Sequence, residues 1–356
     1  MKTFDEDVYD DISAVFKKSR RNPNGAPIAA TLYVTNTSTD YCAVRRLYDA
    51  GHEIASHGLD YMASEYAWST ANQSTWVEQL AGQRLNIAER TQIPETEIHG
   101  ARAPYLAPGG DVMLDMMRNA GFAYDSTLPF AGADANNSQG WPLTLDFVPG
   151  GDECSHWQCP SRCHHGLWEV PIRRLLASDN TTRCTQLDFC EVHTHVTRNK
   201  QPLLNETLFL FRHNFYEYYN ANKAPVVFSM NTEWFAQNDV LVEALNEFLD
   251  EILTNDDVYV ITTWQALQWI REPTPLANLT SFQPWAQNKR QVQECSFDIS
   301  ETRGSRNDGV AADDVAVLIE DTSTENFLSG NTLVVIEILV FVFAALVLIA
   351  RDNHVA

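Results

Sequence analysis

Several polar residues follow short apolar runs of the sequence, at the points where those runs end. They are Asp5 with Glu6, His57 to Tyr61, Arg102 with Tyr105, Asp125, and Asn231. If the runs are parallel strands, their carboxyl ends meet at one edge of a sheet, where α/β enzymes gather their catalytic groups. Adjacent carboxylates at such a strand end can supply a base and a metal ligand. The acidic stretch 5–7 is also typical of a helix N-terminus, where carboxylates are favourable.

Short β-rich runs alternate with helical patterns along the chain. Apolar positions at helical spacing occupy residues 75–90 and 240–253. Alternation of this kind predicts an α/β fold with a parallel sheet or barrel. The predicted strands lie within residues 28–34, 52–57, 99–104, 123–127, 168–172, 225–231 and 258–262.

Length and charge limit the class of protein. The chain has 356 residues, of which 44% are hydrophobic, and a formal net charge of −22. This length predicts one large domain with a tail rather than a string of small modules. The net charge and the lack of a run of lysine and arginine argue against a nucleic-acid partner, because a phosphate backbone needs a concentrated basic surface. Neutral partners such as glycans remain open.

Seven cysteines, five of them between residues 154 and 190, indicate a disulfide-bonded insertion in a secreted protein. The odd count leaves one thiol free or paired outside the chain. A zinc knuckle is the alternative, built from Cys154, Cys159, Cys163, His164 and His165. The glycosylation sequons favour secretion and therefore disulfides. They begin at Asn36, Asn72, Asn136, Asn180, Asn205 and Asn278.

The two ends of the sequence suggest how the protein is placed in the cell. No signal peptide precedes Thr3, so we expect that this chain lacks its native N-terminus. Residues 286–330 are polar and acidic and predict a flexible stalk. The apolar run Leu333 to Ala350, followed by Arg351, predicts a transmembrane helix over 331–351 with a short tail at 352–356. The domain itself would span 1–285 and lie outside the cell or in a lumen.

Six segments, in this order, resemble the polysaccharide deacetylase family with the NodB homology domain (carbohydrate esterase family 4), and most closely the animal chitin deacetylases. The resemblance covers roughly residues 1 to 280, and five of the segments match family motifs at compatible spacings. The segments are TFDED at 3–7, GHEIASHGLDY at 51–61, RAPYL at 102–106, YDSTLP at 124–129, PVVFSMNTEWF at 225–235 and TTWQALQWIREPTP at 262–275.

The resemblance implies a distorted (β/α) barrel and a divalent metal, usually zinc, held by an aspartate and two histidines. It implies metal-dependent hydrolysis of N-acetyl groups in chitin or another glycan that contains N-acetylglucosamine. By position, Asp5 is the base, Glu6 and Tyr61 stand at two metal-ligand positions, and His57 is the third ligand. Arg102 orients the base, the backbone N–H at Tyr105 stabilises the oxyanion, Asp125 supports the catalytic histidine, and Asn231 stands where that histidine should be.

Three of these positions depart from the family pattern. Glu6 is one methylene longer than aspartate, and Tyr61 carries a phenol that is protonated at neutral pH. Asn231 has no titratable proton, so a general acid worth about 10²–10⁴ in rate is missing. We therefore expect weak or lost deacetylase activity. One alternative is an enzyme with a rebuilt site that uses Asp60 and a histidine such as His193 or His195. The other is an inactive glycan-binding protein of the extracellular matrix.

The resemblance bears on the cysteines as well. Animal members place cysteines at similar positions, which implies two disulfides among Cys154, Cys159, Cys184 and Cys190, with three pairings open. Four aromatic residues near the predicted edge of the sheet could stack on sugar rings, although most tryptophans in a barrel are core residues. They are Tyr105, Trp141, Trp168 and Trp234.

Overall fold

Each of the seven predicted β-rich runs contains a strand in the computed structural model. The structure describes residues 6–17, 19–37, 39–60, 64–129, 140–150, 154, 158–190, 200–285 and 334–342. Five strands run parallel and pair in chain order apart from one short insertion. They are β1 (Thr31–Val34), β2 (Glu53–Ser56), β3 (Gly100–Ala101), β4 (Tyr124–Asp125) and β6 (Trp168–Glu169).

The remaining strands of the main sheet complete a mixed arrangement. β5 (Leu143–Thr144) pairs antiparallel with β6, while β9 (Val226–Asn231) and β10 (Val258–Ile261) both pair antiparallel with β11 (Val334–Val342). A separate hairpin joins β7 (Leu175–Leu176) and β8 (Arg183–Cys184). The order β10–β11–β1–β2–β3–β4–β6–β5, with β9 also beside β11, does not close into a ring among the described strands. An α/β fold with a parallel core is therefore confirmed, whereas barrel closure stays a prediction.

β11 lies within the apolar run that was predicted to be a transmembrane helix. The structure has a strand over Val334–Val342, and the rest of 331–351 lies outside the described residues, as does the predicted stalk. A run rich in valine and isoleucine suits a central strand, and hydrophobicity alone does not separate such a strand from a buried helix. In the part of the chain that the structure describes, no helix is long and apolar enough to cross a membrane.

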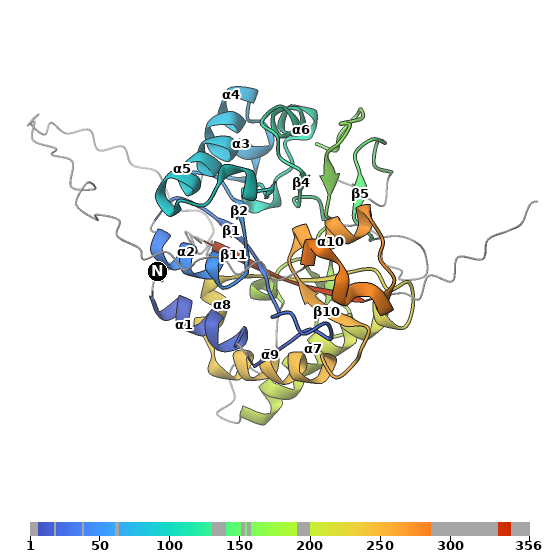
Figure 1. Ribbon diagram of the computed structural model, residues 1–356. Coiled ribbons are helices and arrows are strands. Elements are labelled where there is room, and N and C mark those ends of the chain that lie inside the picture. The colour runs from blue at the N-terminus through green and yellow to red at the C-terminus, as the bar shows by residue number, and fades with distance from the viewer. Residues whose placement is uncertain are drawn as a thin grey trace, which may run out of the picture.

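Helices cover the sheet on several sides (Figure 1). α7 (Lys200–Tyr219) and α9 (Asp239–Ile252) lie side by side, and α10 (Thr263–Arg271) follows β10. The short helices gather at the other end of the molecule in Figure 1. They are α3 (Glu65–Ser69), α4 (Gln73–Trp76), α5 (Gly82–Thr91) and α6 (Gly110–Asn119), while α2 (Tyr41–Asp49) connects β1 to β2. The predicted helical stretches 75–90 and 240–253 are confirmed by α4–α5, which a π-helical turn at Val77–Ala81 joins, and by α9.

The first described residues form a helix rather than the end of a strand. α1 spans Glu6–Val15 and packs against α2, α9 and α8 (Thr232–Gln237). Glu6 is its first residue, and Asp5 lies outside the described residues. The placement follows the second interpretation of this acidic stretch, because a carboxylate in the first turn interacts favourably with the positive end of the helix dipole.

The largest core cluster contains a group of aromatic rings that joins α7, α9 and β9. Phe211 stacks on Phe248 with ring centroids 5.2 Å apart and meets Phe228 edge-on at the same separation. All three rings are fully buried. Aromatic pairs in such offset and edge-to-face arrangements stabilise a core beyond the area they bury. This cluster fixes the helical layer against the strand that ends at Asn231.

We expect Phe211→Ala to lower the free energy of unfolding by about 3–5 kcal/mol, because it leaves a cavity between two helices and a strand. The matched control is Phe209→Ala on the same helix, where the ring is 40% exposed, and the expected loss there is below about 1 kcal/mol. Urea denaturation of both variants measures the difference. Equal losses would contradict the assignment of this cluster as the core.

Candidate functional site

The carboxyl ends of neighbouring strands bring four of the predicted site residues toward one edge of the sheet. His57 directly follows β2, Arg102 directly follows β3, and Asp125 and Asn231 are the last residues of β4 and β9. We call these four residues the rim. All four are buried, and Arg102 and Asp125 have no measurable exposure.

His57 is held as a neutral imidazole. Its Nδ1 lies 2.9 Å from the carbonyl oxygen of Arg102. Because a carbonyl only accepts, Nδ1 carries the proton and Nε2 carries the lone pair, which is the tautomer of a metal-ligating histidine. Burial, with the Arg102 charge as a smaller cause, lowers the pKa of His57 to about 3. The ring therefore stays uncharged across the physiological range.

Arg102 connects three strands through its guanidinium group. Its Nε donates to the Ser126 carbonyl at 2.6 Å and one terminal nitrogen donates to the Ser126 hydroxyl at 2.8 Å. The other terminal nitrogen donates to the Ser229 hydroxyl on β9 at 3.1 Å. The guanidinium carbon also lies 4.1 Å from the centroid of the Tyr33 ring on β1. The base that it would orient, Asp5, lies outside the described residues.

Asn231 lies at the end of β9 on the same side of the strand as Ser229, because side chains two residues apart share a face. Its backbone N–H donates to Asp188 at 2.8 Å. Asp188 belongs to the turn Leu187–Phe189, which sequence reasoning did not single out. Burial raises the pKa of Asp188 to about 7, against the opposing hydrogen bond from Asn231. A titratable carboxyl therefore lies beside the position predicted for the catalytic acid.

The predicted oxyanion residue lies in a strained turn. Tyr105 has a φ of 59° and Leu106 a φ of 53°, both in the left-handed region that costs a non-glycine residue about 1–3 kcal/mol. The side chain of Tyr105 is 48% exposed, so its ring is accessible beside the rim. Such strain is typical of functional turns because the surrounding structure must enforce it.

The other aromatic candidates are less accessible. Trp234 is 3% exposed and packs against Phe211 and Phe235, so in the structure it is a core residue and not a sugar platform. Trp141 and Trp168 are half-buried and pack against core clusters. Tyr105 is thus the most exposed of the four.

The remaining candidates for metal ligand and acid are Asp60, Tyr61, His193, His195 and Glu6. Asp60 is exposed, and its backbone N–H donates to the Gln79 amide oxygen at 2.9 Å. Tyr61, His193 and His195 lie outside the described residues, and only the backbone of Glu6 is described. Within the described ranges, no three histidine, cysteine or acidic side chains come together as a metal site. His57 alone does not make one, since zinc sites use three or four protein ligands.

A cavity of about 870 Å³ lies at the opposite end of the parallel strands from the rim. Its wall includes Glu53 at the start of β2, His99 just before β3, and Trp264 and Trp285. None of the rim residues lines it. The carboxylate of Glu53 accepts hydrogen bonds from Thr31 and the Trp264 N–H, so it fixes this wall.

The cysteine-rich insertion is held by disulfides. Cys154 pairs with Cys159 and Cys184 with Cys190, which confirms the two predicted bonds and selects one of the three pairings. Cys163 is a free, exposed thiol, and Cys42 is disulfide-bonded as well. The zinc-knuckle alternative is wrong, because two of its cysteines are oxidised to a disulfide.

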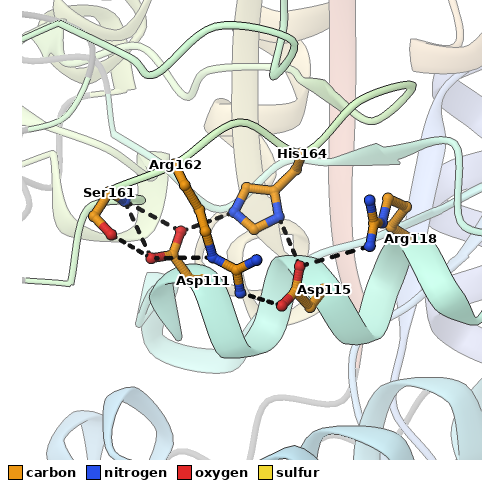
Figure 2. A network of polar contacts seen from close by, with 6 residues as sticks. All are labelled: Asp111, Asp115, Arg118, Ser161, Arg162 and His164. Carbon is orange, nitrogen blue, oxygen red and sulfur yellow. Dashed lines mark hydrogen bonds and ion pairs between the residues drawn. The ribbon is translucent and has the colours of Figure 1, made fainter.

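The histidine of that alternative has a different role (Figure 2). His164 is fully buried, with Nε2 2.8 Å from Asp111 and Nδ1 3.2 Å from Asp115, both on α6. The neighbouring Ser161 donates to Asp111 through its hydroxyl at 2.5 Å and its N–H at 3.1 Å, and Arg162 pairs with Asp115. The network attaches the insertion to α6, at one flank of the molecule.

Comparison with known proteins identifies two relatives. No family model matches the chain. Chitin deacetylase 1 of Bombyx mori is 32% identical over 290 residues, which is 80% of this chain and 52% of the relative. Chitin deacetylase 8 of Bombyx mori is 29% identical over 279 residues, which is 78% of this chain and 68% of the relative. The chain thus spans about half the length of the first relative and two thirds of the second.

We expect Asp111→Asn to reduce the free energy of unfolding by about 1–2 kcal/mol at neutral pH, because charge-assisted hydrogen bonds to the insertion are lost. Burial alone would raise the pKa of Asp111, but hydrogen bonds from Ser161 and His164 bring it below its ordinary value. Its contribution is therefore present above about pH 4 and is lost as the pH falls through the lower, folded-state pKa.

Thermal unfolding of this variant and the wild type between pH 2.5 and 7 measures the effect, and the two curves should converge at acidic pH. The control is Arg118→Ala, whose side chain is 44% exposed and 4.0 Å from Asp115, with an expected loss below about 1 kcal/mol. A constant difference at every pH would show that the Asp111 charge does not hold the insertion.

Proposed function

We propose that this chain, which is similar to two chitin deacetylases, is a chitin deacetylase-like polysaccharide deacetylase that recognises an N-acetylglucosamine polymer at the rim, with weak or lost hydrolytic activity. One observation carries the second half of this proposal. The amide side chain of Asn231 stands at the end of β9, where the family has its acid, and an amide donates hydrogen bonds but does not release a proton at neutral pH.

The scaffold around that position supports the first half. His57, Arg102 and Asp125 are buried and mutually positioned through backbone and side-chain hydrogen bonds. The exposed ring of Tyr105 beside them offers a flat apolar surface, and such surfaces pack on the hydrophobic faces of sugar rings. A site of this kind can retain affinity for a glycan without the groups that cleave its acetamide bond.

Hydrolysis of an N-acetyl group needs a water activated for attack and a proton for the departing amine. In the family reaction a divalent metal, when bound, polarises the acetamide carbonyl and helps to activate the water. In this chain the neutral His57 offers an Nε2 lone pair to such a metal, and the backbone N–H at Tyr105 would donate to the developing oxyanion. Proton donation is the step that no rim side chain supplies at neutral pH.

A second candidate function is a deacetylase with a rebuilt acid. It is favoured by Asp188, whose carboxyl contacts the Asn231 backbone and whose pKa burial raises to about 7. A carboxyl that still holds its proton near neutral pH can protonate a leaving group. An enzyme that depends on it would lose activity as the pH rises through about 7.

We expect little acetate release from N-acetylglucosamine oligomers by the wild-type chain, together with measurable oligomer binding. The triple variant Glu6→Asp, Tyr61→His, Asn231→His should bind more zinc and gain activity, because a general acid alone is worth about 10²–10⁴ in rate. The three single variants are the matched controls and should gain little, since ligands and acid act as one unit. Acetate release, zinc content and oligomer titration measure the three effects.

Substantial turnover by the wild type that Asp5→Asn abolishes would contradict this proposal and favour the rebuilt site. Loss of the same turnover in Asp188→Asn, with oligomer binding retained, would identify the new acid. A triple variant that binds zinc but stays inactive would mean that the site has diverged beyond its three substituted positions. Absence of oligomer binding in every variant would contradict glycan recognition itself.

We also propose an extracellular or lumenal location for the domain. The two disulfides support an oxidising compartment. We expect the native protein to shift to lower apparent mass after treatment with an N-glycosidase, because six sequons are present. Gel mobility with and without the N-glycosidase measures this shift. The location would be contradicted if the mobility did not change and if added protease cleaved the protein only from the cytosolic side.

A further inference from the structure

Two carboxyl side chains face each other in the interior behind the rim. Asp125 on β4 and Glu169 on β6 are directly opposite partners in the parallel ladder. Asp125 has no measurable exposure and Glu169 is 1% exposed. Two carboxylates that lie next to each other in a buried position cannot both stay ionised without a large cost in free energy.

The hydrogen bonds of the two carboxyl groups leave one oxygen of each group without a donor among the described residues. Asp125 Oδ1 accepts from the Thr127 hydroxyl at 2.5 Å, and Glu169 Oε1 accepts from the Leu128 backbone N–H at 3.0 Å. Asp125 Oδ2 and Glu169 Oε2 are buried and receive no hydrogen bond from a donor group among the described residues. The two side chains are within hydrogen-bonding distance of each other, and a hydrogen bond between two carboxyl groups requires one proton. One shared proton would satisfy both oxygens.

The nearby charge agrees with that proton count. Arg102 is a cation that acts on both carboxyls, and it donates hydrogen bonds to Ser126 and Ser229. His57 on the neighbouring strand is neutral at physiological pH. With one proton, the carboxyl pair carries a single negative charge near this guanidinium. With none, it would carry two negative charges in the interior.

We propose that Asp125 and Glu169 share one proton and that Glu169 is a positioning residue of the rim. Through the Leu128 N–H, Glu169 fixes the turn from Asp125 to Leu128. The carbonyl and hydroxyl of Ser126 in that turn hold Arg102 in place. What the rim binds rests on the proposed function, whereas the shared proton does not.

The pKa directions support the assignment of the proton to Glu169. Burial raises the pKa of Asp125 to about 6, while burial and the Asp125 charge raise that of Glu169 further above its ordinary value. Both groups bind protons more tightly in the folded than in the unfolded chain. Their contribution to stability is therefore complete below about pH 4 and is lost as the pH rises through the folded-state values.

The test compares unfolding of the full chain with Glu169→Gln between pH 4.5 and 9. Glutamine keeps a donor for Asp125 and an acceptor for the Leu128 N–H but does not titrate. The unfolding constant of the wild type should rise relative to that of the variant by up to about tenfold per pH unit, until the pair ionises. Asp146→Asn is the control, because hydrogen bonds from Thr144 and Gly166 lower the pKa of this exposed carboxyl, so its contribution changes only below about pH 4 and its curve should run parallel to that of the wild type across this window. Parallel curves for the wild type and Glu169→Gln would overturn the shared proton.

If Glu169→Gln does not fold, carboxyl-carbon NMR of the labelled wild type follows the same groups directly. Asp125 and Glu169 should then titrate together, with one proton retained at pH 7, and two ionised carboxyls at that pH would overturn the proposal.

The positioning role is tested with Glu169→Leu, which fills similar volume but offers no acceptor. Titration with an N-acetylglucosamine oligomer should show weaker binding for Glu169→Leu and near wild-type binding for Glu169→Gln. Wild-type affinity in a folded Glu169→Leu variant would overturn the role. If the wild type itself binds no oligomer, the proposed function fails, while the pH dependence still decides the shared proton.

Discussion

The buried guanidinium of Arg102 is the constraint on which the rim depends. A permanent positive charge with no exposure needs both hydrogen-bond acceptors and a compensating negative charge. Ser126 and Ser229 accept hydrogen bonds from it, and the carboxyl pair of Asp125 and Glu169 contributes negative charge nearby. Because these groups come from three different strands, one side chain fixes the relative position of β3, β4 and β9. The neutral state of His57 follows from the same charge and the same burial.

Much of the fold was predictable because it depends on local patterns. Apolar runs of five to seven residues that alternate with helical patterns contain the strands, and the amphipathic stretch 240–253 became α9. The two ends of the chain were harder to predict. The acidic stretch at Glu6 suits either a strand end or a helix start, and the structure forms α1 there. The run at Val334–Val342 suits either a spanning helix or a central strand, and pairing with β1, β9 and β10 gives a strand.

The candidate site was predictable only where a polar residue directly follows or ends an apolar run. His57, Arg102, Asp125 and Asn231 met that condition, and the structure places all four at strand ends. Two further groups were missed. Glu169 lies inside a strand-like run where a charged residue signals a buried partner, but the partner is 44 residues away in sequence. Asp188 lies in a cysteine-rich turn whose contact with Asn231 exists only in the folded chain. Sequence spacing carries no information about either long-range contact.

Burial changes how the match to the family pattern should be interpreted. Arg102 and Asp125 match the pattern, but both are fully buried, and replacing Arg102 would remove a cation that acts on the buried carboxyl pair, which is destabilising. Folding is therefore a reason for their presence beside catalysis. Asn231 differs because its contact with Asp188 is made by the backbone N–H, which any residue other than proline provides. Folding does not require an asparagine side chain there, so the absence of a titratable group at this position carries more information about activity than the intact buried residues around it.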